Sequence, residues 1–209
     1  FILEIGNEKP IKFKIHAITL EKGEGNFRGP VSDRFGQRIK GNWPGKVSDP
    51  AEFLKHKATE EDKLKDIAPI WKDAYGGWSN GPQLKATGFF RVEEHNGKWW
   101  FVTPQGKLFW SLGVTGVRPR EKQADVTIVK EREEIFEWLP ARDGEFADVW
   151  VDDKALSFYH INLIRKYEKL EHWRKTTIQR FKSWGLNSIG NWSEDSLVFQ
   201  SDVPFTYSF

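Results

Sequence analysis

The sequence predicts an α/β fold in which the C-terminal half pairs its strands in parallel. Residues 108–114 are almost all apolar, as in a parallel strand that is buried on both faces. Patterns typical of helices and strands then alternate from residue 154 to residue 209. Short β-prone runs and segments rich in Gly and Pro precede residue 108, so the N-terminal half is organised differently.

The N-terminal half begins with predicted strands and a long linker. Within residues 1–20, Ile11, Phe13 and Ile15 alternate with polar residues at the period of two of a sheet with one wet face. Residues 21–50 contain so many glycines and prolines that they predict an extended loop.

A helix and a hairpin are predicted next. Ser48, Asp49 and Pro50 mark a helix start, and the helix is expected to run to about Asp66. Residues 71–88 return to Gly and aromatic residues. Residues 89–102 predict a β-hairpin, because Asn-Gly at 96–97 suits the type I′ turn, which needs positive φ at both central positions. A second turn follows at 103–107.

The C-terminal half is predicted to contain most of the helices. Residues 118–153 are polar and irregular, apart from a short helix expected over 130–139. Two helices are predicted at 154–170 and 172–184, and Gly185 stands where a helix C-terminal glycine belongs. The second helix carries an apolar stripe that comprises Trp173, Ile178, Phe181 and Trp184.

The last residues predict a strand, a helix and a strand. The first strand covers 186–190, Ser193 is expected to cap a helix over 194–200, and the final strand covers 203–207. The chain starts without Met and stops within a strand-like run, so we expect it to be a piece of a longer protein.

The composition excludes several functional classes. Lys and Arg total 32 against 30 Asp and Glu, which argues against a dedicated nucleic-acid-binding protein. The mean hydropathy is −0.62 and no long uncharged apolar run occurs, so no membrane span is expected. The absence of Cys removes disulfides, thiolate metal sites and Cys nucleophiles, and it is compatible with an oxidising compartment.

Generic catalytic motifs are absent. Ser111 resembles the end of a nucleophile elbow, but Phe109 replaces the required Gly, so a buried strand serine is expected. Gly23 and Gly25 do not form a dinucleotide fingerprint, and the five His show no metal-ligand spacing. We therefore expect no metal and no cofactor. The acceptor pattern for glycosylation at 191–193 matters only in a eukaryotic secreted protein.

Adjacent carboxylates do not provide a ready catalytic pair. The candidate pairs are Glu93/Glu94, Glu133/Glu134 and Glu194/Asp195. Neighbouring residues point to different sides of a strand and do not face each other on a helix, so solvated surface charges are expected.

Position along the predicted strands gives a better indication of a site. Ligands of parallel α/β sheets meet residues at the carboxyl ends of strands. Arg118 follows the first such end, and Asn191, Trp192 and Ser193 follow the second. An indole that stacks on a pyranose, beside amide and guanidinium donors, is a combination that binds sugars. A packing role for Trp192 is the alternative.

Long aromatic-rich blocks of this chain resemble the β-agarases of glycoside hydrolase family 50. They include FRGPVSDRFGQ at 27–37, YGGW at 75–78 and KSWGLNSIGNWS at 182–193, with further blocks at 43–46, 86–92, 99–104, 108–114, 136–140 and 165–167. The similarity covers most of residues 27–209 in the same order.

The resemblance implies the first portion of a (β/α)8 TIM barrel. Residues 1–22 would be the last strands of an N-terminal β-sandwich, a carbohydrate-binding-like module. Residues 23–85 would be an extended aromatic and Gly-rich linker with one helix, and 86–209 the N-terminal part of the catalytic barrel. The 124 residues from 86 to 209 compare with about 250 in a typical barrel.

The resemblance also implies retaining hydrolysis of β-galactosidic bonds in agar-type marine galactans. The catalytic carboxylates are expected beyond residue 209, so the isolated chain should be inactive. Arg118, Asn191 and Trp192 are the expected sugar contacts, with Glu137 and Trp138 as further candidates. A partner is expected in the remainder of its own barrel, and the resemblance implies an extracellular or periplasmic bacterial location.

Two alternatives remain open at this stage. The chain could be a non-catalytic galactan-binding module whose Trp-rich surface holds polysaccharide. It could also belong to a related barrel enzyme that acts on carrageenan or porphyran. A partial barrel leaves strand edges unpaired, so the chain alone is expected to be poorly soluble or disordered beyond residue 150.

Overall fold

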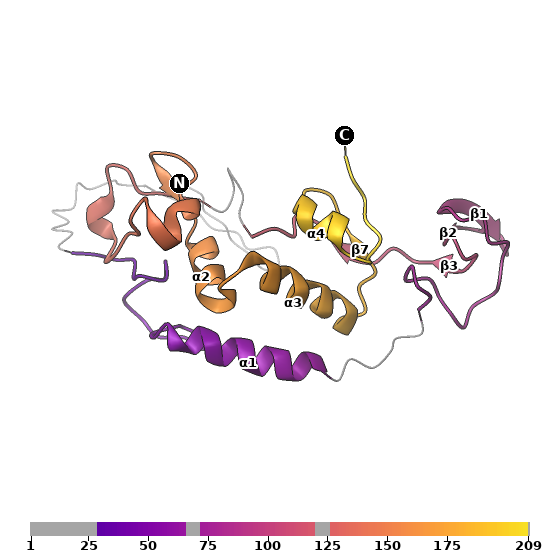
Figure 1. Ribbon diagram of the computed structural model, residues 1–209, viewed down its shortest axis with the longest axis horizontal. Coiled ribbons are helices and arrows are strands. Elements are labelled where there is room, and N and C mark those ends of the chain that lie inside the picture. The colour runs from indigo at the N-terminus through magenta and orange to yellow at the C-terminus, as the bar shows by residue number, and fades with distance from the viewer. Residues whose placement is uncertain (1–28, 66–71, 120–125, 209) are drawn as a thin grey trace, which may run out of the picture.

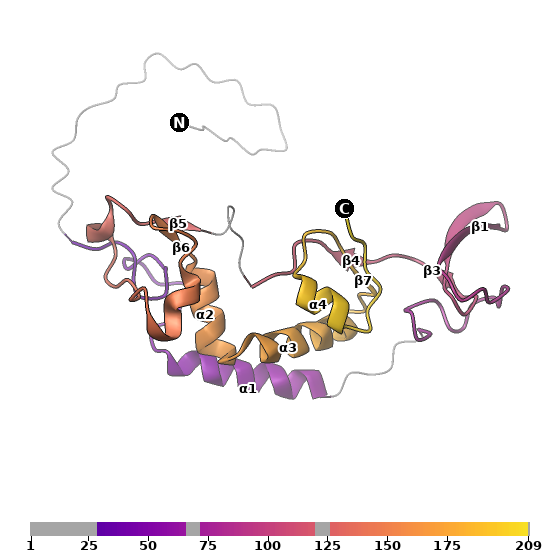
Figure 2. The same ribbon diagram turned by 45° about the horizontal axis from the view of Figure 1, so that its top comes forward.

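The computed structural model describes residues 29–65, 72–119 and 126–208, and it shows an elongated molecule with three helices along its middle (Figure 1). Helix α1 (Ala51–Lys65) packs beside α2 (Phe158–Tyr167) and α3 (Leu170–Ser183). A small antiparallel sheet extends as an arm at one end (Figure 2). The mixture of helices and strands confirms the predicted α/β class.

The arm is a three-stranded sheet in which β2 is central. Strand β1 (Arg91–His95) pairs antiparallel with β2 (Lys98–Val102), which pairs with β3 (Leu108–Phe109). Asn96 and Gly97 have φ of 53° and 74°, so the hairpin turns where the Asn-Gly signal predicts it. The predicted turn at 103–107 joins β2 to β3.

The prediction of one strand over 108–114, buried on both faces, is wrong. Leu108 and Phe109 are buried, but Trp110 is 72% exposed, and Ser111 is exposed instead of buried as predicted. The chain changes partners here, because β3 belongs to the arm and β4 (Gly113–Val114) starts a different sheet.

Strand β4 pairs in parallel with β7 (Ser188–Ile189), as the predicted strand order implies. The two backbones lie so close that a Cβ atom at Gly113 would stand 1.9 Å from the carbonyl oxygen of Ser188. Buried Asn187 holds the arm to this pair, since its side chain donates to the carbonyls of Gly76 and Trp110 and accepts from the amide of Leu112.

Helix α1 begins where the sequence predicts and extends to Lys65, while its predicted end at about Asp66 lies outside the described residues. The Glu52 carboxylate accepts hydrogen bonds from the amides of Ser48 and Asp49, at 2.8 and 2.9 Å, and the Asp49 carboxylate accepts from the amide of Ala51 at 2.7 Å. These bonds satisfy amide groups at the helix start. They also lower the pKa of the Glu52 carboxyl.

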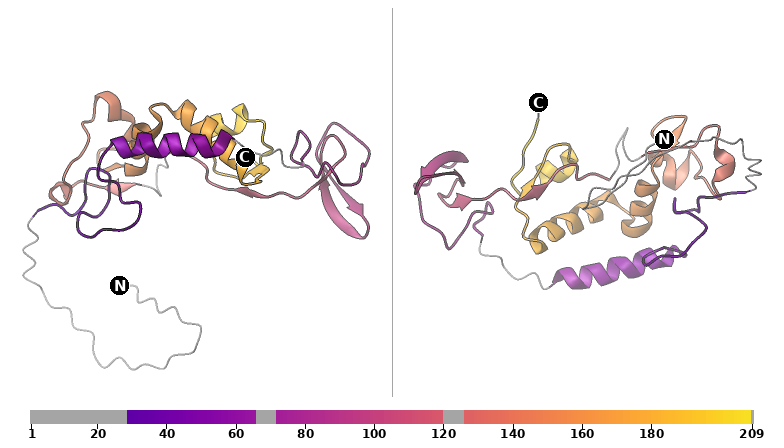
Figure 3. Two further views of the ribbon diagram at one scale, coloured as in Figure 1. Left: turned by 90° about the horizontal axis from the view of Figure 1, so that it is seen from below. Right: turned by 180° about the vertical axis from the view of Figure 1, so that it is seen from behind.

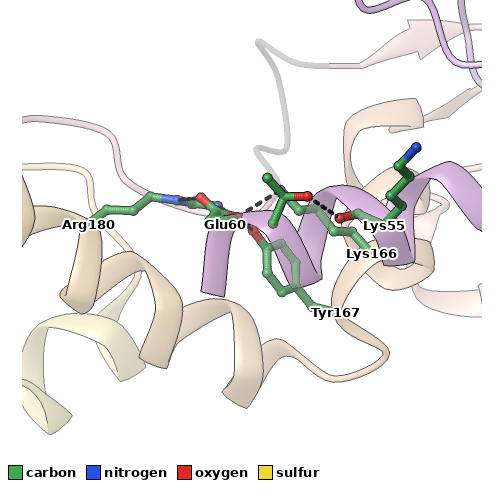
Figure 4. Close-up of polar contacts among 6 residues, drawn as sticks. Lys55, Glu60, Lys166, Tyr167 and Arg180 are labelled. Atoms are coloured by element: carbon green, nitrogen blue, oxygen red, sulfur yellow. Dashed lines mark hydrogen bonds and ion pairs between the residues drawn. The ribbon is translucent and has the colours of Figure 1, made fainter. Parts of the chain in front are cut away.

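A partly buried carboxylate fixes α1 to the two C-terminal helices (Figure 4). Glu60 of α1 accepts hydrogen bonds from Arg180 of α3 and from Lys166 and Tyr167 of α2. Burial alone raises the pKa of the Glu60 carboxyl, but the cationic Arg180 and Lys166 outweigh it and lower the pKa to about 2. The predicted linker helix is therefore attached to the C-terminal half by charge-assisted bonds.

Both predicted C-terminal helices are present, but the first begins at Phe158 and not at residue 154, because Ala155 and Leu156 form a strand. Trp173 and Phe181 of α3 pack with Ile189 of β7 in the largest core cluster. Ile178 is half-buried, and Trp184, which follows the last residue of α3, is 64% exposed. Gly185 ends the helix at positive φ, as predicted.

The segment from residue 126 to α2 is mostly irregular, as predicted. It contains β5 (Thr127–Ile128), paired antiparallel with β6 (Ala155–Leu156), and two 3-10 helices, η1 (Glu133–Ile135) and η2 (Gly144–Val149). The predicted helix over 130–139 is therefore wrong except for the single turn of η1.

The last elements are shorter than predicted. Helix α4 (Asp195–Gln200) forms, but no side chain caps it, so the capping role predicted for Ser193 is wrong. The predicted strand 203–207 is reduced to one parallel bridge between Ile189 and Phe205. Figure 3 shows this C-terminal segment beside α4, between the arm and α2.

Two expectations are not tested by this arrangement. The strands predicted within 1–20, and the module assigned to 1–22, lie outside the described residues. The domain boundaries at 22/23 and 85/86 stay predictions. Among the described residues, no helix is both long enough and apolar enough to cross a membrane.

Candidate functional site

The carboxyl ends of β4 and β7 lie side by side, as the sequence predicts. The amide of Gly116 donates to the carbonyl of Asn191 at 2.8 Å, and the amide of Glu194 donates to the carbonyl of Val117 at 2.9 Å. Ser193 links the same two segments, because its hydroxyl accepts from the Val117 amide at 3.1 Å. The predicted residues Arg118, Asn191 and Trp192 therefore sit on two adjoining loops.

Trp192 is the most exposed of these side chains, at 70%. Its φ of 60° lies in the left-handed region, which a bulky residue seldom adopts. Strained backbone of this kind persists where surrounding structure holds it, and it is frequent at functional sites. Within the described residues most of the indole surface is therefore open to a ligand.

Asn191 and Arg118 are half-buried beside this indole. The Asn191 amide donates to the Ser208 hydroxyl at 2.8 Å, while its buried Oδ1 has no hydrogen-bond partner among the described residues. The amide thus fixes the C-terminal segment against β7. Arg118 leaves β4 directly after the hydrogen-bonded end, so its guanidinium is carried by the same pair of strands.

The structure does not bring Glu137 and Trp138 to this place. The segment that carries them lies on the far side of α2 from β4 and β7, at one end of the molecule, whereas β4 and β7 lie near its middle (Figure 2). The Trp138 ring packs edge-on against Phe146, with the Arg165 guanidinium 5.1 Å from its centre. Trp138 is thus a packing residue of the cluster around η2, and Glu137 is an exposed neighbour.

The candidate carboxylates are held in structural contacts or lie in solvent. Glu194 makes two hydrogen bonds to the Arg174 guanidinium, at 2.5 and 2.6 Å, and these raise the pKa of Arg174. Glu93 pairs with Arg91 on the same strand of the arm. Glu133 and Glu134 are exposed on η1. As predicted, the two carboxylates of each adjacent pair do not face each other.

Sequence reasoning missed the contacts that shape the loop after β7. The Ser193 hydroxyl meets the Val117 amide across 76 residues of sequence, and the ion pair between Arg174 and Glu194 spans 20 residues, so residue spacing signals neither contact. The described residues contain no group of three or more His, Asp or Glu placed to hold a metal ion.

An aromatic cleft of about 530 Å³ lies at the opposite, amino ends of β4 and β7. Phe90, Phe101 and Phe109 of the arm form one wall, and Phe205 forms part of the other. The hydroxyls of Ser111 and Ser188 share a hydrogen bond at its base. The strand pair β4 and β7 therefore has polar residues at its carboxyl ends and an apolar cleft at its amino ends.

Comparisons with known proteins point to agar-degrading enzymes. The chain is 34% identical over 94% of its length to β-agarase B of Vibrio sp. (strain JT0107), and 26% identical over 84% to β-agarase A of the same strain. It spans only 24% and 19% of those two proteins. No protein-family model matches the chain.

Solved structures give the same result. PfGH50B superposes on 86% of the chain with a TM-score of 0.73 and 29% identity, and the agarase AgWH50C on 86% with 0.74 and 27%. An exo-β-agarase covers 87%, with 0.73 and 28%. The chain spans about 30% of these structures. The predicted relationship to the family 50 β-agarases is confirmed.

Proposed function

We propose that this chain is part of a β-agarase-like glycoside hydrolase that cleaves β-galactosidic bonds in agar-type galactans with retention. The observation that carries the proposal is the 34% identity to β-agarase B over nearly the whole chain. Retaining enzymes of this kind use two carboxyl groups about 5–5.5 Å apart, one as nucleophile and one as acid and base. We place both outside residues 1–209.

The parallel pair β4 and β7 supports an early position in a (β/α)8 barrel. The two strands are joined through α2 and α3, which is the strand–helix–strand order of such a barrel. The sandwich module, the linker boundaries and the remainder of the barrel belong to the same proposal. So does an extracellular or periplasmic location, which suits an enzyme whose polysaccharide substrate is too large to enter a cell.

Trp192 is the proposed stacking residue for a galactose unit, with Arg118 and Asn191 as polar neighbours. Barrel enzymes bind substrate at the carboxyl ends of the strands, and these residues follow two such ends. The exposure of the indole and its left-handed backbone support this role. Glu137 and Trp138 are not part of the proposed site.

Agarose electrophoresis together with product analysis tests the proposal. The isolated 209 residues should release no neoagaro-oligosaccharides, but they should be retarded in agarose relative to a gel without galactan. Trp192→Ala should reduce the retardation, while Trp99→Ala, an equally exposed indole on the arm, should not. Product release by the isolated chain would show that the catalytic pair lies within it.

A non-catalytic galactan-binding module is the second candidate. It is favoured by the exposed Trp192 and by the absence of two facing carboxylates among the adjacent pairs in the described residues. The two candidates differ in a longer protein that contains this chain. Hydrolysis of agarose by that protein supports the enzyme, and retardation without products supports the module.

A further inference from the structure

We propose that Ser193 is a positioning residue of the candidate site. Its hydroxyl holds the loop after β7, residues 190–194, so that the Trp192 indole is presented in one preformed orientation. The ion pair between Arg174 and Glu194 anchors the same loop to α3. This inference rests on the proposed function, because it explains how the proposed stacking residue is held ready for a sugar that Ser193 itself does not touch.

The direction of the Trp192 indole depends on its backbone. The side chain is 70% exposed, and it makes no hydrogen bond and no ring contact within residues 29–65, 72–119 and 126–208. Trp99, the comparably exposed indole of the arm, stands on β2, where pairing with β1 fixes its direction. Trp192 lies in a loop, so the conformation of that loop decides where its indole points.

Two backbone hydrogen bonds bracket Trp192. On one side, the Asn191 carbonyl accepts from the amide of Gly116 at 2.8 Å. On the other side, the Glu194 amide donates to the carbonyl of Val117 at 2.9 Å. Between these bonds Trp192 has φ of 60°, a left-handed conformation that is unfavourable for a bulky residue. The surrounding structure must therefore hold this residue in place.

The Ser193 hydroxyl completes the bracket, because it both donates and accepts. It donates to the Gly190 carbonyl at 2.7 Å, which closes the turn around Trp192. It accepts from the Val117 amide at 3.1 Å, which ties that turn to the segment after β4. The cost of a left-handed bulky residue is of the same order as the net gain from two hydrogen bonds. Loss of this hydroxyl is therefore enough to release Trp192 from its conformation.

The ion pair supplies a second anchor for the loop. The Glu194 carboxylate accepts two hydrogen bonds from the Arg174 guanidinium, at 2.6 and 2.5 Å, and the two side chains are only 19% and 20% exposed. Bonding at two points is directional as well as strong. Arg174 follows Trp173, which is buried in the largest core cluster, so the loop is joined to the core through α3.

A preformed indole lowers the cost of binding. The apparent affinity for a ligand falls in proportion to the fraction of the protein that is in the competent conformation before the ligand arrives. A galactose unit that stacks on Trp192 would meet an indole that is already in place. Ser193 therefore controls affinity through Trp192.

The first test observes the indole without any sugar. The 11 tryptophans of the 209-residue chain are labelled as 5-fluorotryptophan, and Trp192→Phe identifies the fluorine NMR signal of that residue. Ser193→Ala should shift and broaden the signal, while Ser193→Thr, which keeps the hydroxyl, should leave it single and sharp. Ser196→Ala, on the neighbouring α4, is the control and should not change it. The signals of the other tryptophans, Trp99 included, report whether each variant is folded.

Arg174→Lys is a second variant. It keeps the positive charge but cannot bond the Glu194 carboxylate at two points. It should change the Trp192 signal in the same direction as Ser193→Ala, by a smaller amount. A Trp192 signal that stays the same in folded Ser193→Ala would overturn the proposal, whatever the chain binds.

The second test measures retardation of the same variants in agarose. Ser193→Ala should raise the apparent dissociation constant about tenfold, as expected when about a tenth of the loops remain competent, and Ser193→Thr should restore it. A changed Trp192 signal with unchanged retardation would contradict the role of Ser193 in sugar binding. If Ser193→Ala changes the signal but even the unsubstituted chain is not retarded, Ser193 still positions Trp192 and the proposed function is wrong.

Discussion

The antiparallel arm and the parallel pair of β4 and β7 are both small sheets, yet they depend on very different parts of the sequence. In the arm, β1 and β2 are joined by two residues, and the turn that these two residues form sets the register between the two strands. In the parallel pair, Gly113 meets Ser188, 75 residues further along the chain. Local turn chemistry builds the first sheet, and tertiary packing builds the second.

The difference extends to the role of glycine. Gly97 is required in the arm by its positive φ, and a Cβ atom there would meet no other atom within 4 Å. Gly113 does not need positive φ, but its Cβ would collide with the Ser188 carbonyl. A conformational requirement is visible in the sequence as Asn-Gly. A requirement for close approach of two backbones is not, because the partner lies far away.

Gly113→Ala is expected to have the largest effect, because the new methyl group would displace β7 from β4. We expect a loss of about 3 kcal/mol or more in the free energy of unfolding, measured by urea denaturation. Gly116→Ala is the matched control, since its Cβ meets nothing within 4 Å and only its φ of 68° opposes the change. The control should cost about 1 kcal/mol. Equal losses for the two variants would show that β4 and β7 are not in close contact.

The same contrast explains how much of the fold the sequence predicts. The hairpin at Asn96 and Gly97 and the start of α1 follow from residues within a few positions of each other, and they are confirmed. The exposure of Val114 and Trp184 is not predictable in this way. An apolar side chain indicates that a residue should be covered, but not whether a neighbouring element is present to cover it.

The candidate residues were located to different degrees for a related reason. Arg118, Asn191 and Trp192 were chosen because they follow strand carboxyl ends, and they lie on adjoining loops; their contact with sugar stays a prediction. Glu137 and Trp138 came from similarity alone, without a strand to position them, and they lie elsewhere. Position in a fold therefore located residues better than residue type did.

Glu60→Gln tests a second contact between residues far apart in the sequence. If the ion pairs of Glu60 stabilise the fold, tertiary contacts hold α1 in place, as they hold β4 beside β7. The folded pKa of about 2 is below the ordinary value near 4.5, so the ionised carboxylate stabilises the folded chain above pH 4.5. This contribution is lost as the pH falls towards 2. With allowance for partial solvent screening, we expect Glu60→Gln to cost roughly 2 kcal/mol at pH 7.

The variant should also flatten the dependence of stability on pH between 4.5 and 2. Urea unfolding at several pH values measures both effects. Glu61→Gln, the exposed neighbour on α1, is the control and should change neither. If the two variants show the same pH profile, the ion pairs with Arg180 and Lys166 do not hold α1 to the C-terminal helices.

Gly97→Ala should have the smallest effect of the three changes. Its Cβ would enter open space, so the cost is only that of placing an alanine at φ of 74°, about 1 kcal/mol. Because the arm depends on this turn, hydrogen exchange should increase at β1 and β2 and stay unchanged at β4 and β7. Asn96→Gly, which accepts positive φ freely, should leave the exchange at β1 and β2 nearly as it is. Increased exchange at β7 in Gly97→Ala would show that the two sheets unfold as one unit and that the distinction between local and tertiary control is wrong.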